Sequence, residues 1–271
     1  MQNFKLNEEF LLNNQDWTFP TFTAYGPGRF KEIGKFCKNF KINNALIVTD
    51  SGSVNLPFIS DLQNLLNDSK IKSDIYSNIS PNPRDDEIDS GCKKFREGNH
   101  DAIIAIGGGS AMDGGKAISL TVDSGVPLWD FEFEKEPPKL NMENPFPKII
   151  TIPTTAGTGA ETEVTAMVTH IEKGMKFCLW HPDARPCLAL VDPELTLKLP
   201  ANLTAWTGID AMIHAIEGYS VPMFHPLCDG SALESLNLIS KSLYAAVEEP
   251  DNLLARGGMI IGSYLGGIAF L

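Results

Sequence analysis

The sequence is poor in basic residues and has no long apolar run. Its 271 residues include 22 Lys and Arg against 34 Asp and Glu, which gives a formal net charge of −12. This charge disfavours binding to nucleic acid or to an anionic membrane surface, because both attract basic proteins. Nowhere do about 18 apolar residues follow one another, as a membrane-spanning helix requires. We therefore expect neither nucleic acid nor a membrane as a partner, and we favour small-molecule chemistry.

Paired cysteines and a secretory leader are also missing. The five cysteines are odd in number and form no C-x-x-C pair, so neither a disulfide framework nor a thiolate zinc site is indicated. The first ten residues, MQNFKLNEEF, contain acids where a secretory leader would be basic and then apolar. These observations predict a cytoplasmic protein with reduced thiols.

Strand-like and helix-like segments alternate up to residue 192. Short apolar, β-branched runs of buried-strand length occur at 45–49, 102–106, 148–152 and 188–191. Helical patterns occur at 56–69, 83–98 and 110–120. This alternation predicts an α/β domain over residues 1–192, with a mostly parallel sheet covered by helices.

The pattern changes after residue 192. Three helical stretches follow without a strand between them, at 202–219, 229–249 and 251–271, and they predict an all-α domain over residues 193–271. The last stretch carries five glycines, which weaken an isolated helix but let another backbone approach closely, so we expect it to have a close neighbour. It has no glycine stop, basic last turn or polar tail, so we expect this domain to be truncated.

A glycine-rich segment, GGGSAMDGGK at 107–116, follows a predicted strand and opens a helix. Backbone N–H groups without side chains, together with a helix N-terminus, can hold a pyrophosphate. The segment is not a G-x-G-x-x-G motif and does not follow the first strand, so the usual dinucleotide fingerprint does not apply. Phosphate binding is our interpretation, and a purely structural turn is the alternative.

A second loop, PTTAGTGAETE at 153–163, offers the hydroxyls of Thr154, Thr155 and Thr158, and Asp50 ends the first predicted strand. The carboxyl ends of parallel strands share one sheet edge, so we expect both loops to face one ligand there. The Asp50 carboxylate would accept bonds from ribose hydroxyls and repel a 2′-phosphate, which favours NAD over NADP. Local turn capping is the alternative for each threonine and for Asp50.

Asp210 and His214 are four residues apart in TGIDAMIHAIEGY, and Glu217 follows three residues later. On a helix the first two project from one face, as two ligands of one metal must. Because two ligands cannot fill a coordination sphere, an exposed or merely hydrogen-bonded pair stays an alternative. His225 is interpreted as a loop cap or surface residue, or else as part of a substrate pocket or a ligand.

Three segments, GGGSAMDGGK, PTTAGTGAE and TGIDAMIHAIEGY, resemble in order and separation the motifs of the iron-containing (group III) alcohol dehydrogenases. The similarity extends from YGPGRF at 25–30 to the final GSYLGGIAFL. The resemblance implies an N-terminal dinucleotide-binding α/β domain followed by an all-α metal-binding domain, with the active site in the cleft between them.

The resemblance also implies roles for individual residues. It places the pyrophosphate on Gly108, Gly109 and Ser110, the nicotinamide beside Thr154, Thr155 and Thr158, and the adenosine ribose at Asp50. Asn82 and Lys176 also match positions that touch the dinucleotide, with a turn asparagine and a solvated lysine as the alternatives. Asp210 and His214 match the first two metal ligands. The family's two further histidine ligands would come after the end of this chain, and Glu163 stands where relatives more often have threonine.

The implied activity is a metal-dependent, NAD-linked dehydrogenation of a small alcohol. The metal is divalent, with iron expected first and zinc second, and no catalytic side chain is implied beyond the metal ligands. The complete enzyme would be a homodimer. One alternative is a relative of the glycerol dehydrogenase or dehydroquinate synthase type. Another is a non-catalytic dinucleotide-binding fragment, or part of a split enzyme, whose last helix would expose an apolar face and promote self-association.

Overall fold

The chain divides into two compact units that interleave along the sequence. The structure is a computed structural model that describes residues 12–13, 15–17, 21–140, 145–221 and 225–269. We call residues 31–152 and 164–189 the sheet unit, and residues 1–30, 153–163 and 190–271 the helical unit. The division of the chain into two domains at residue 192 stays a prediction.

The sheet unit is built on strands in the order β9-β6-β5-β3-β4. β3 is parallel to both β4 and β5, and β6 is parallel to β9. The central strand β5 is buried along its whole length, as its continuous apolar run predicts. The strand bounds are β3 (Asn44–Asp50), β4 (Lys72–Ile79), β5 (Ala102–Gly107), β6 (Lys148–Pro153) and β9 (Leu188–Val191).

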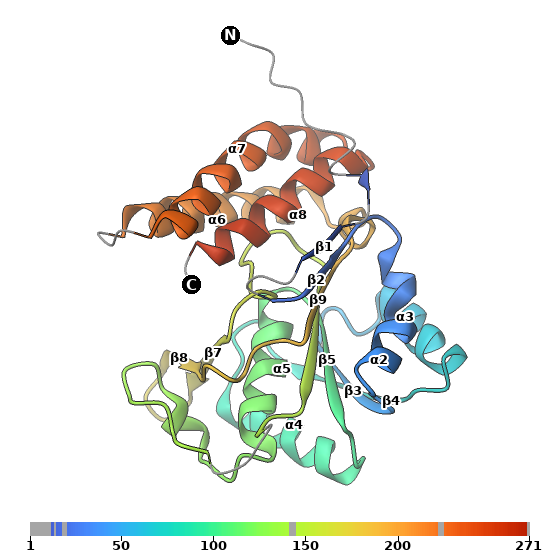
Figure 1. Cartoon of the computed structure of the whole chain (residues 1–271), viewed down its shortest axis with the longest axis vertical. Helices are drawn as coiled ribbons and strands as arrows, with labels where there is room; N and C mark the ends of the chain where they lie inside the picture. The colour runs from blue at the N-terminus through green and yellow to red at the C-terminus, as the bar shows by residue number, and fades with distance from the viewer. Residues whose placement is uncertain (1–11, 14, 18–20, 141–144, 222–224, 270–271) are drawn as a thin grey trace. The chain divides into compact units, whose positions relative to one another are not determined.

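Helices cover both faces of this sheet. α2 (Ile33–Asn39) and α3 (Pro57–Asp68) lie together on one face, and α4 (Asp85–Glu97) and α5 (Gly109–Val122) lie together on the other (Figure 1). The connection through α3 crosses the sheet in one direction, whereas those through α4 and α5 run the opposite way. Because such crossovers are right-handed, the change of direction moves the helices to the other face. The predicted α/β architecture is therefore confirmed.

The four predicted strands are confirmed, but the sequence patterns missed others. β4 has polar residues at most of its positions, because it lies at the edge of the sheet and stays partly exposed. The hairpin of β7 (Thr165–His170) and β8 (Met175–Trp180) is likewise mostly half-buried or exposed, which weakens its apolar signal. The remaining short elements are η1 (Arg29–Glu32), η2 (Leu128–Phe131), β1 (Gln15–Trp17) and β2 (Thr23–Tyr25).

The helical unit contains the three predicted consecutive helices. They are α6 (Ala201–Ser220), α7 (Pro226–Glu248) and α8 (Leu253–Ile268), preceded by η3 (Pro193–Thr196). A Cβ added at Gly262 of α8 would lie 2.6 Å from Ile239 of α7, and one at Gly266 would lie 3.3 Å from the carbonyl oxygen of Ala211 in α6. The expectation of close neighbours for the last helix is confirmed. Among the described residues, no helix is both long and apolar enough to cross a membrane.

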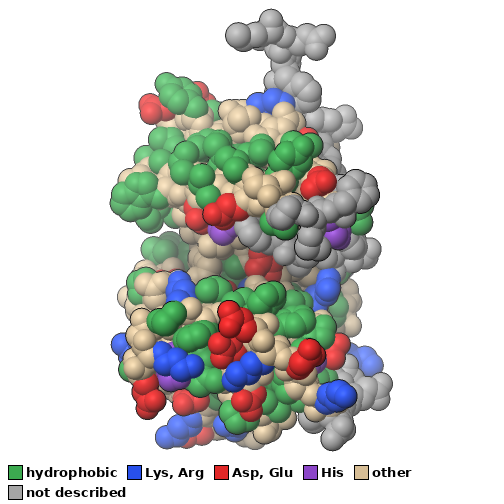
Figure 2. Space-filling view, turned by 90° about the vertical axis from the view of Figure 1, so that its left-hand side faces the viewer, with side chains coloured by type: hydrophobic (Ala, Val, Ile, Leu, Met, Phe, Trp, Pro, Cys, Tyr) green, Lys and Arg blue, Asp and Glu red, His purple; other side chains and the backbone are tan. Residues whose placement is uncertain are grey.

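The expectation of an exposed apolar face on the last helix is wrong. α8 is buried at nearly every described position, because its glycines let the neighbouring elements pack against its backbone. Exposed apolar side chains lie instead on α6, which buries mainly small residues and turns Trp206, Ile209, Ile213 and Ile216 outward. Figure 2 shows hydrophobic side chains gathered on the surface of the helical unit. The last two residues of the predicted uncapped helix end, 270–271, lie outside the described residues.

Candidate functional site

The carboxyl ends of β3 and β5 form a topological switch point. From β3 the chain continues to β4 on one side, whereas from β5 it continues to β6 on the other. In open α/β sheets, ligands bind outside the strand ends at such a point. Asp50 is the last residue of β3, Gly107 is the last residue of β5, and Gly108 is the N-cap of α5. The expected placement of Asp50 and the glycine turn at one edge is confirmed.

Gly107 lies close to Asp50 in a turn that has no room for a side chain. Its φ is +145°, and an added Cβ would lie 2.8 Å from the Cβ of Ala111 and 3.1 Å from Oδ2 of Asp50. Among the described residues, no side chain caps the N-terminus of α5, where Gly108 and Gly109 are half-buried. Bare backbone and a helix N-terminus at this edge fit a pyrophosphate, since any Cβ would fill the space.

Asp50 serves a structural purpose as well. Its Oδ1 accepts hydrogen bonds from the backbone N–H groups of Gly52 and Ser53, at 2.9 Å each, which is the turn capping considered as an alternative. Its Oδ2 lies toward Gly107. The neighbouring Thr49 was missed by the sequence reasoning: its Oγ1 is buried, has no hydrogen-bond partner among the described residues, and lies 3.7 Å from the Cβ position of Gly107. The only signal was a polar residue near the end of an apolar strand.

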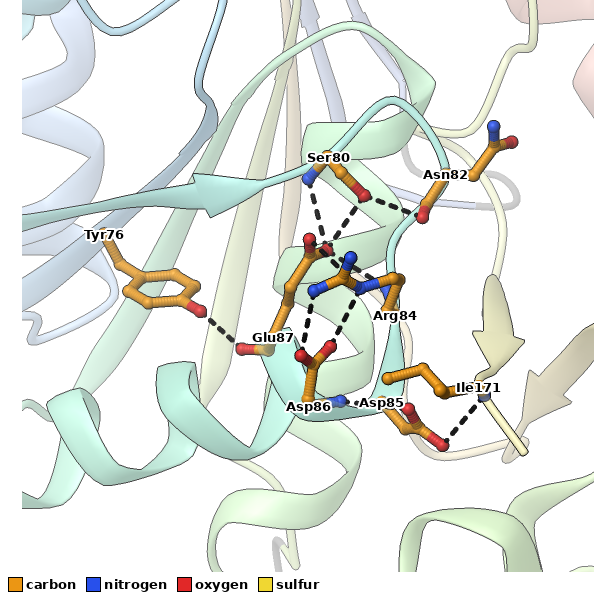
Figure 3. Close-up of polar contacts among 8 residues, drawn as sticks. All are labelled: Tyr76, Ser80, Asn82, Arg84, Asp85, Asp86, Glu87 and Ile171. Atoms are coloured by element: carbon orange, nitrogen blue, oxygen red, sulfur yellow. Dashed lines mark hydrogen bonds and ion pairs between the residues drawn. The ribbon is translucent and has the colours of Figure 1, made fainter. Parts of the chain in front are cut away.

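Three further cofactor candidates lie in the sheet unit. The Ser110 hydroxyl donates to the carbonyl oxygen of Pro81 at 2.6 Å, so the turn that contains Asn82 lies against the glycine turn. Asn82 is exposed, and its side chain points away from the polar contacts around it (Figure 3). Lys176 is exposed on β8, where it pairs in register with Thr169. The structure therefore brings Asn82 and Ser110 into one neighbourhood.

The threonine-bearing loop 153–163 belongs to the helical unit and lies against α8. A Cβ at Gly159, whose φ is +66°, would lie 2.7 Å from the carbonyl oxygen of Ser263. Thr154 is buried and Thr155 is half-buried. The Thr158 hydroxyl accepts a bond from the N–H of Ala160 at 3.3 Å, which is the local turn capping considered as its alternative.

The same loop also approaches the metal-ligand candidates. A Cβ at Gly157 would lie 3.0 Å from the Cβ of Thr207 and 3.4 Å from Oδ2 of Asp210, both on α6. A glycine is needed here because a side chain would press against the α6 face that carries Asp210. The two motifs, which are about 50 residues apart in the sequence, are therefore neighbours in the helical unit.

Asp210 and His214 lie side by side on α6, as their spacing predicts. Nε2 of His214 is 3.6 Å from Oδ2 of Asp210, and the side chains are 32% and 47% exposed. The Asp210 carboxylate raises the pKa of His214, with smaller contributions from the charges of Glu163 and Glu217, while burial acts in the opposite direction. Two atoms that each bind one ion at about 2.1 Å can be at most about 4.2 Å apart, so this separation fits a shared divalent metal.

The pair supplies only part of a coordination sphere. Within the described ranges there is no group of three or more His, Cys, Asp or Glu residues that could hold a metal ion. His225 does not join the pair in the helical unit: its Nδ1 accepts a hydrogen bond from the N–H of Cys228 at 3.2 Å and caps α7. This position corresponds to the loop cap considered for His225.

Two family profiles match nearly the whole chain. The profile "Iron-containing alcohol dehydrogenase" matches residues 20–193, and "Fe-containing alcohol dehydrogenase family, C-terminal" matches residues 204–271. The chain belongs to the iron-containing alcohol dehydrogenase family. Curated members of this family include the NAD-dependent methanol dehydrogenase of Bacillus methanolicus and alcohol dehydrogenase 4 of Saccharomyces cerevisiae. Each is 34% identical to this chain over 251 residues, which is 93% of this chain and 65% or 64% of the relative. The chain thus spans just under two thirds of their length.

Solved structures of family members show the same fold. A 1,3-propanediol oxidoreductase is 31% identical and superposes with a TM-score of 0.87 over 95% of this chain and 66% of its own. The sulfoacetaldehyde reductase of Bifidobacterium kashiwanohense, solved in complex with NAD+, is also 31% identical. It superposes with a TM-score of 0.83 over 95% of this chain and 66% of its own. These likenesses confirm the family resemblance predicted from the three motifs.

Proposed function

We propose that the protein is a metal-dependent, NAD-linked alcohol dehydrogenase that transfers a hydride between a small alcohol and the nicotinamide, with an aldehyde or ketone as the other partner. The observation that carries this proposal is the side-chain-free turn at Gly107, beside Asp50 at the switch point, in a chain of the iron-containing alcohol dehydrogenase family. The similar methanol dehydrogenase is NAD-dependent, and the similar reductase binds NAD+, which supports the choice of cofactor.

In this proposal the contacts of the dinucleotide are assigned to individual residues by their match to the family. Asp50 accepts bonds from the adenosine ribose and disfavours a 2′-phosphate by charge repulsion, so NAD is preferred over NADP. The pyrophosphate is assigned to the backbone at Gly108, Gly109 and Ser110, the nicotinamide side to Thr154, Thr155 and Thr158, and further contacts to Asn82 and Lys176.

Asp210 and His214 would hold a divalent metal, iron or zinc, since a carboxylate and an imidazole suit either ion. When bound, such a cation supplies Lewis-acid stabilisation of the alcohol oxygen as its proton leaves. We assign no side chain as a general base, because protons can leave through ribose hydroxyls or water. The similar proteins are named for methanol and 1,3-propanediol, so we assign a class of small alcohols and not one compound.

We also propose that the protein works in the cytoplasm as a homodimer. The cytoplasmic placement rests on the five free cysteines and the absence of C-x-x-C pairs, and the dimer rests on the family resemblance. A mass measurement of the purified protein by light scattering would test the dimer directly.

Two titrations test the proposed function. The chain is purified anaerobically and titrated with Zn2+ or Fe2+ by calorimetry, and with NADH by fluorescence. We expect NADH binding, and metal binding that His214→Ala weakens at least about tenfold, because each side chain that binds the ion directly contributes strongly to affinity. Glu234→Ala, which changes an exposed acid on α7, is the matched control and should leave both unchanged.

The combined results for NADH and for the metal ion distinguish the proposed function from its alternatives. NADH binding together with metal binding that is unchanged in Asp210→Ala and His214→Ala would show that the metal site lies elsewhere. NADH binding with no metal binding would favour a non-catalytic dinucleotide-binding role for this chain. Absence of NADH binding would contradict the proposed function.

A further inference from the structure

One turn, residues 80–84, contacts two other segments of the sheet unit that carry cofactor candidates. The turn itself contains Asn82. Its Pro81 carbonyl oxygen accepts the hydrogen bond from the Ser110 hydroxyl at 2.6 Å. Its Pro83 carbonyl oxygen accepts a bond from the N–H of Thr169 at 2.7 Å, and Thr169 pairs with Lys176 across the β7–β8 hairpin. The turn therefore sets the positions of Asn82, Ser110 and the hairpin that carries Lys176.

The start of α4 adds a second attachment to the same hairpin. Oδ2 of Asp85 accepts a bond from the N–H of Ile171 at 3.4 Å and lies 3.6 Å from Nδ1 of His170 (Figure 3). The His170 ring is stacked on Trp129, with the ring centroids 4.5 Å apart. The hairpin is therefore attached to the turn and to the start of α4 by hydrogen bonds, and to Trp129 by a stacked aromatic pair.

One carboxylate oxygen fixes the shape of this turn. Oε2 of Glu87 accepts bonds from the backbone N–H of Ser80 at 3.2 Å and from the N–H of Arg84 at 3.1 Å (Figure 3). It also lies 3.1 Å from the Ser80 hydroxyl, which has a nearer acceptor in the carbonyl oxygen of Asn82 at 2.8 Å. The Glu87 side chain is only 12% exposed. The Arg84 guanidinium bonds mainly to Asp86, at 3.0 and 2.8 Å. Glu87 thus joins both ends of the turn, while Asn82 projects from its middle.

We propose that Glu87 is a positioning residue for the dinucleotide: through the turn 80–84 it holds Asn82, and through Pro81 it holds Ser110, in the arrangement that binds the cofactor. This inference rests on the proposed NAD-linked function. Glu87 also caps α4, and a cap alone would affect only stability. Positioning predicts in addition that affinity for the dinucleotide depends on Glu87, and that this dependence acts through Asn82.

The test measures NADH affinity by fluorescence titration of the full chain. We expect Glu87→Ala to weaken NADH binding about tenfold, because the backbone N–H groups of Ser80 and Arg84 lose their acceptor and the turn relaxes. Glu87→Gln should restore most of the loss, since its amide oxygen can accept the bonds that Oε2 accepts. Glu97→Ala, on the same helix with a side chain 64% exposed, is the matched control and should bind NADH like the unaltered chain.

A double-mutant cycle separates positioning from capping. Asn82→Ala should weaken NADH binding clearly in the unaltered chain but by less than about twofold in the Glu87→Ala chain, because the amide is already displaced. Additive effects of the two changes would overturn the inference.

The unaltered chain and a second variant decide the remaining outcomes. If the unaltered chain binds NADH and Glu87→Ala binds it equally well, the inference is overturned and the proposed function stands. If the unaltered chain does not bind NADH, both are overturned. Should Glu87→Ala fail to fold, Glu87→Asp replaces it, because it keeps the charge but withdraws the carboxylate by one methylene group. The inference would then be overturned if Glu87→Asp binds NADH as tightly as the unaltered chain and if Asn82→Ala weakens NADH binding equally in both.

Discussion

The two candidate sites of this chain are built in different ways. In the sheet unit, the site at the switch point consists of backbone around Gly107 and the Asp50 carboxylate, which strand order and helix position hold in place. In the helical unit, the site consists of two side chains, Asp210 and His214, one helical turn apart and 47% and 32% exposed. A backbone-built site cannot be altered without straining the fold, whereas an exposed pair can be changed with little effect on stability.

The largest expected effect is at Gly107, in the backbone-built site. Gly107→Val should weaken NADH binding at least about 100-fold, because the side chain displaces the turn from a cofactor that needs close approach. It should also lower the free energy of unfolding by about 2–3 kcal/mol, because a positive φ and a Cβ 2.8 Å from Ala111 are both unfavourable. Fluorescence titration with NADH and urea unfolding measure the two effects.

A glycine in an open position provides the control for Gly107. In the described part of the chain, nothing lies within 4 Å of a Cβ added at Gly230, which is inside α7. Gly230→Ala should therefore leave NADH affinity unchanged and raise the free energy of unfolding by about 0.5–1 kcal/mol. Wild-type NADH affinity in Gly107→Val would show that the switch-point turn does not hold the cofactor.

An intermediate effect is expected from the charge of Asp50. Asp50→Asn keeps the oxygen that accepts bonds from Gly52 and Ser53 but removes the negative charge. We expect the affinity for NADPH relative to NADH to rise about fivefold, since two charges near 4 Å interact by about 1 kcal/mol in water. The two dissociation constants are compared in Asp50→Asn and in the control Asp61→Asn, an exposed site on α3. An unchanged ratio would place the ribose elsewhere.

The smallest expected effect concerns His100, which precedes β5 in the sheet unit. Burial lowers the pKa of His100, whereas the unfolded chain takes up the proton near the ordinary value of about 6.5. The unfolded state therefore binds more protons below that pH, so this contribution to stability is full above about pH 6.5 and is lost as the pH falls. His100→Asn should reduce the difference in urea midpoint between pH 7.5 and pH 5. An equal pH dependence in both proteins would exclude this role for His100.

Sequence patterns predicted the buried strands and the helices α3 to α8 well, but they missed the short helix α2 and the hairpin that carries Lys176. The strand at 188–191 was predicted with the bounds that the structure has. An apolar run of only four residues has the length of a buried strand and is too short for a helix. β7 and β8 were missed because each has only six residues and most of these are half-buried or exposed, so neither shows a continuous apolar run. The exposed apolar residues were expected on α8 and lie on α6, because helix burial depends on which neighbours pack closest.

The sequence by itself determined the alternation of strands and helices, the glycine turn before α5 and the common face of Asp210 and His214, since each depends on local periodicity or on the lack of a Cβ. Only the tertiary structure decided that Asp50 faces Gly107, that Gly157 lies against the helix of Asp210, and that the turn held by Glu87 contacts Ser110 and the β7–β8 hairpin. These contacts join residues far apart in the chain, and they follow from strand order and packing, which no local pattern encodes.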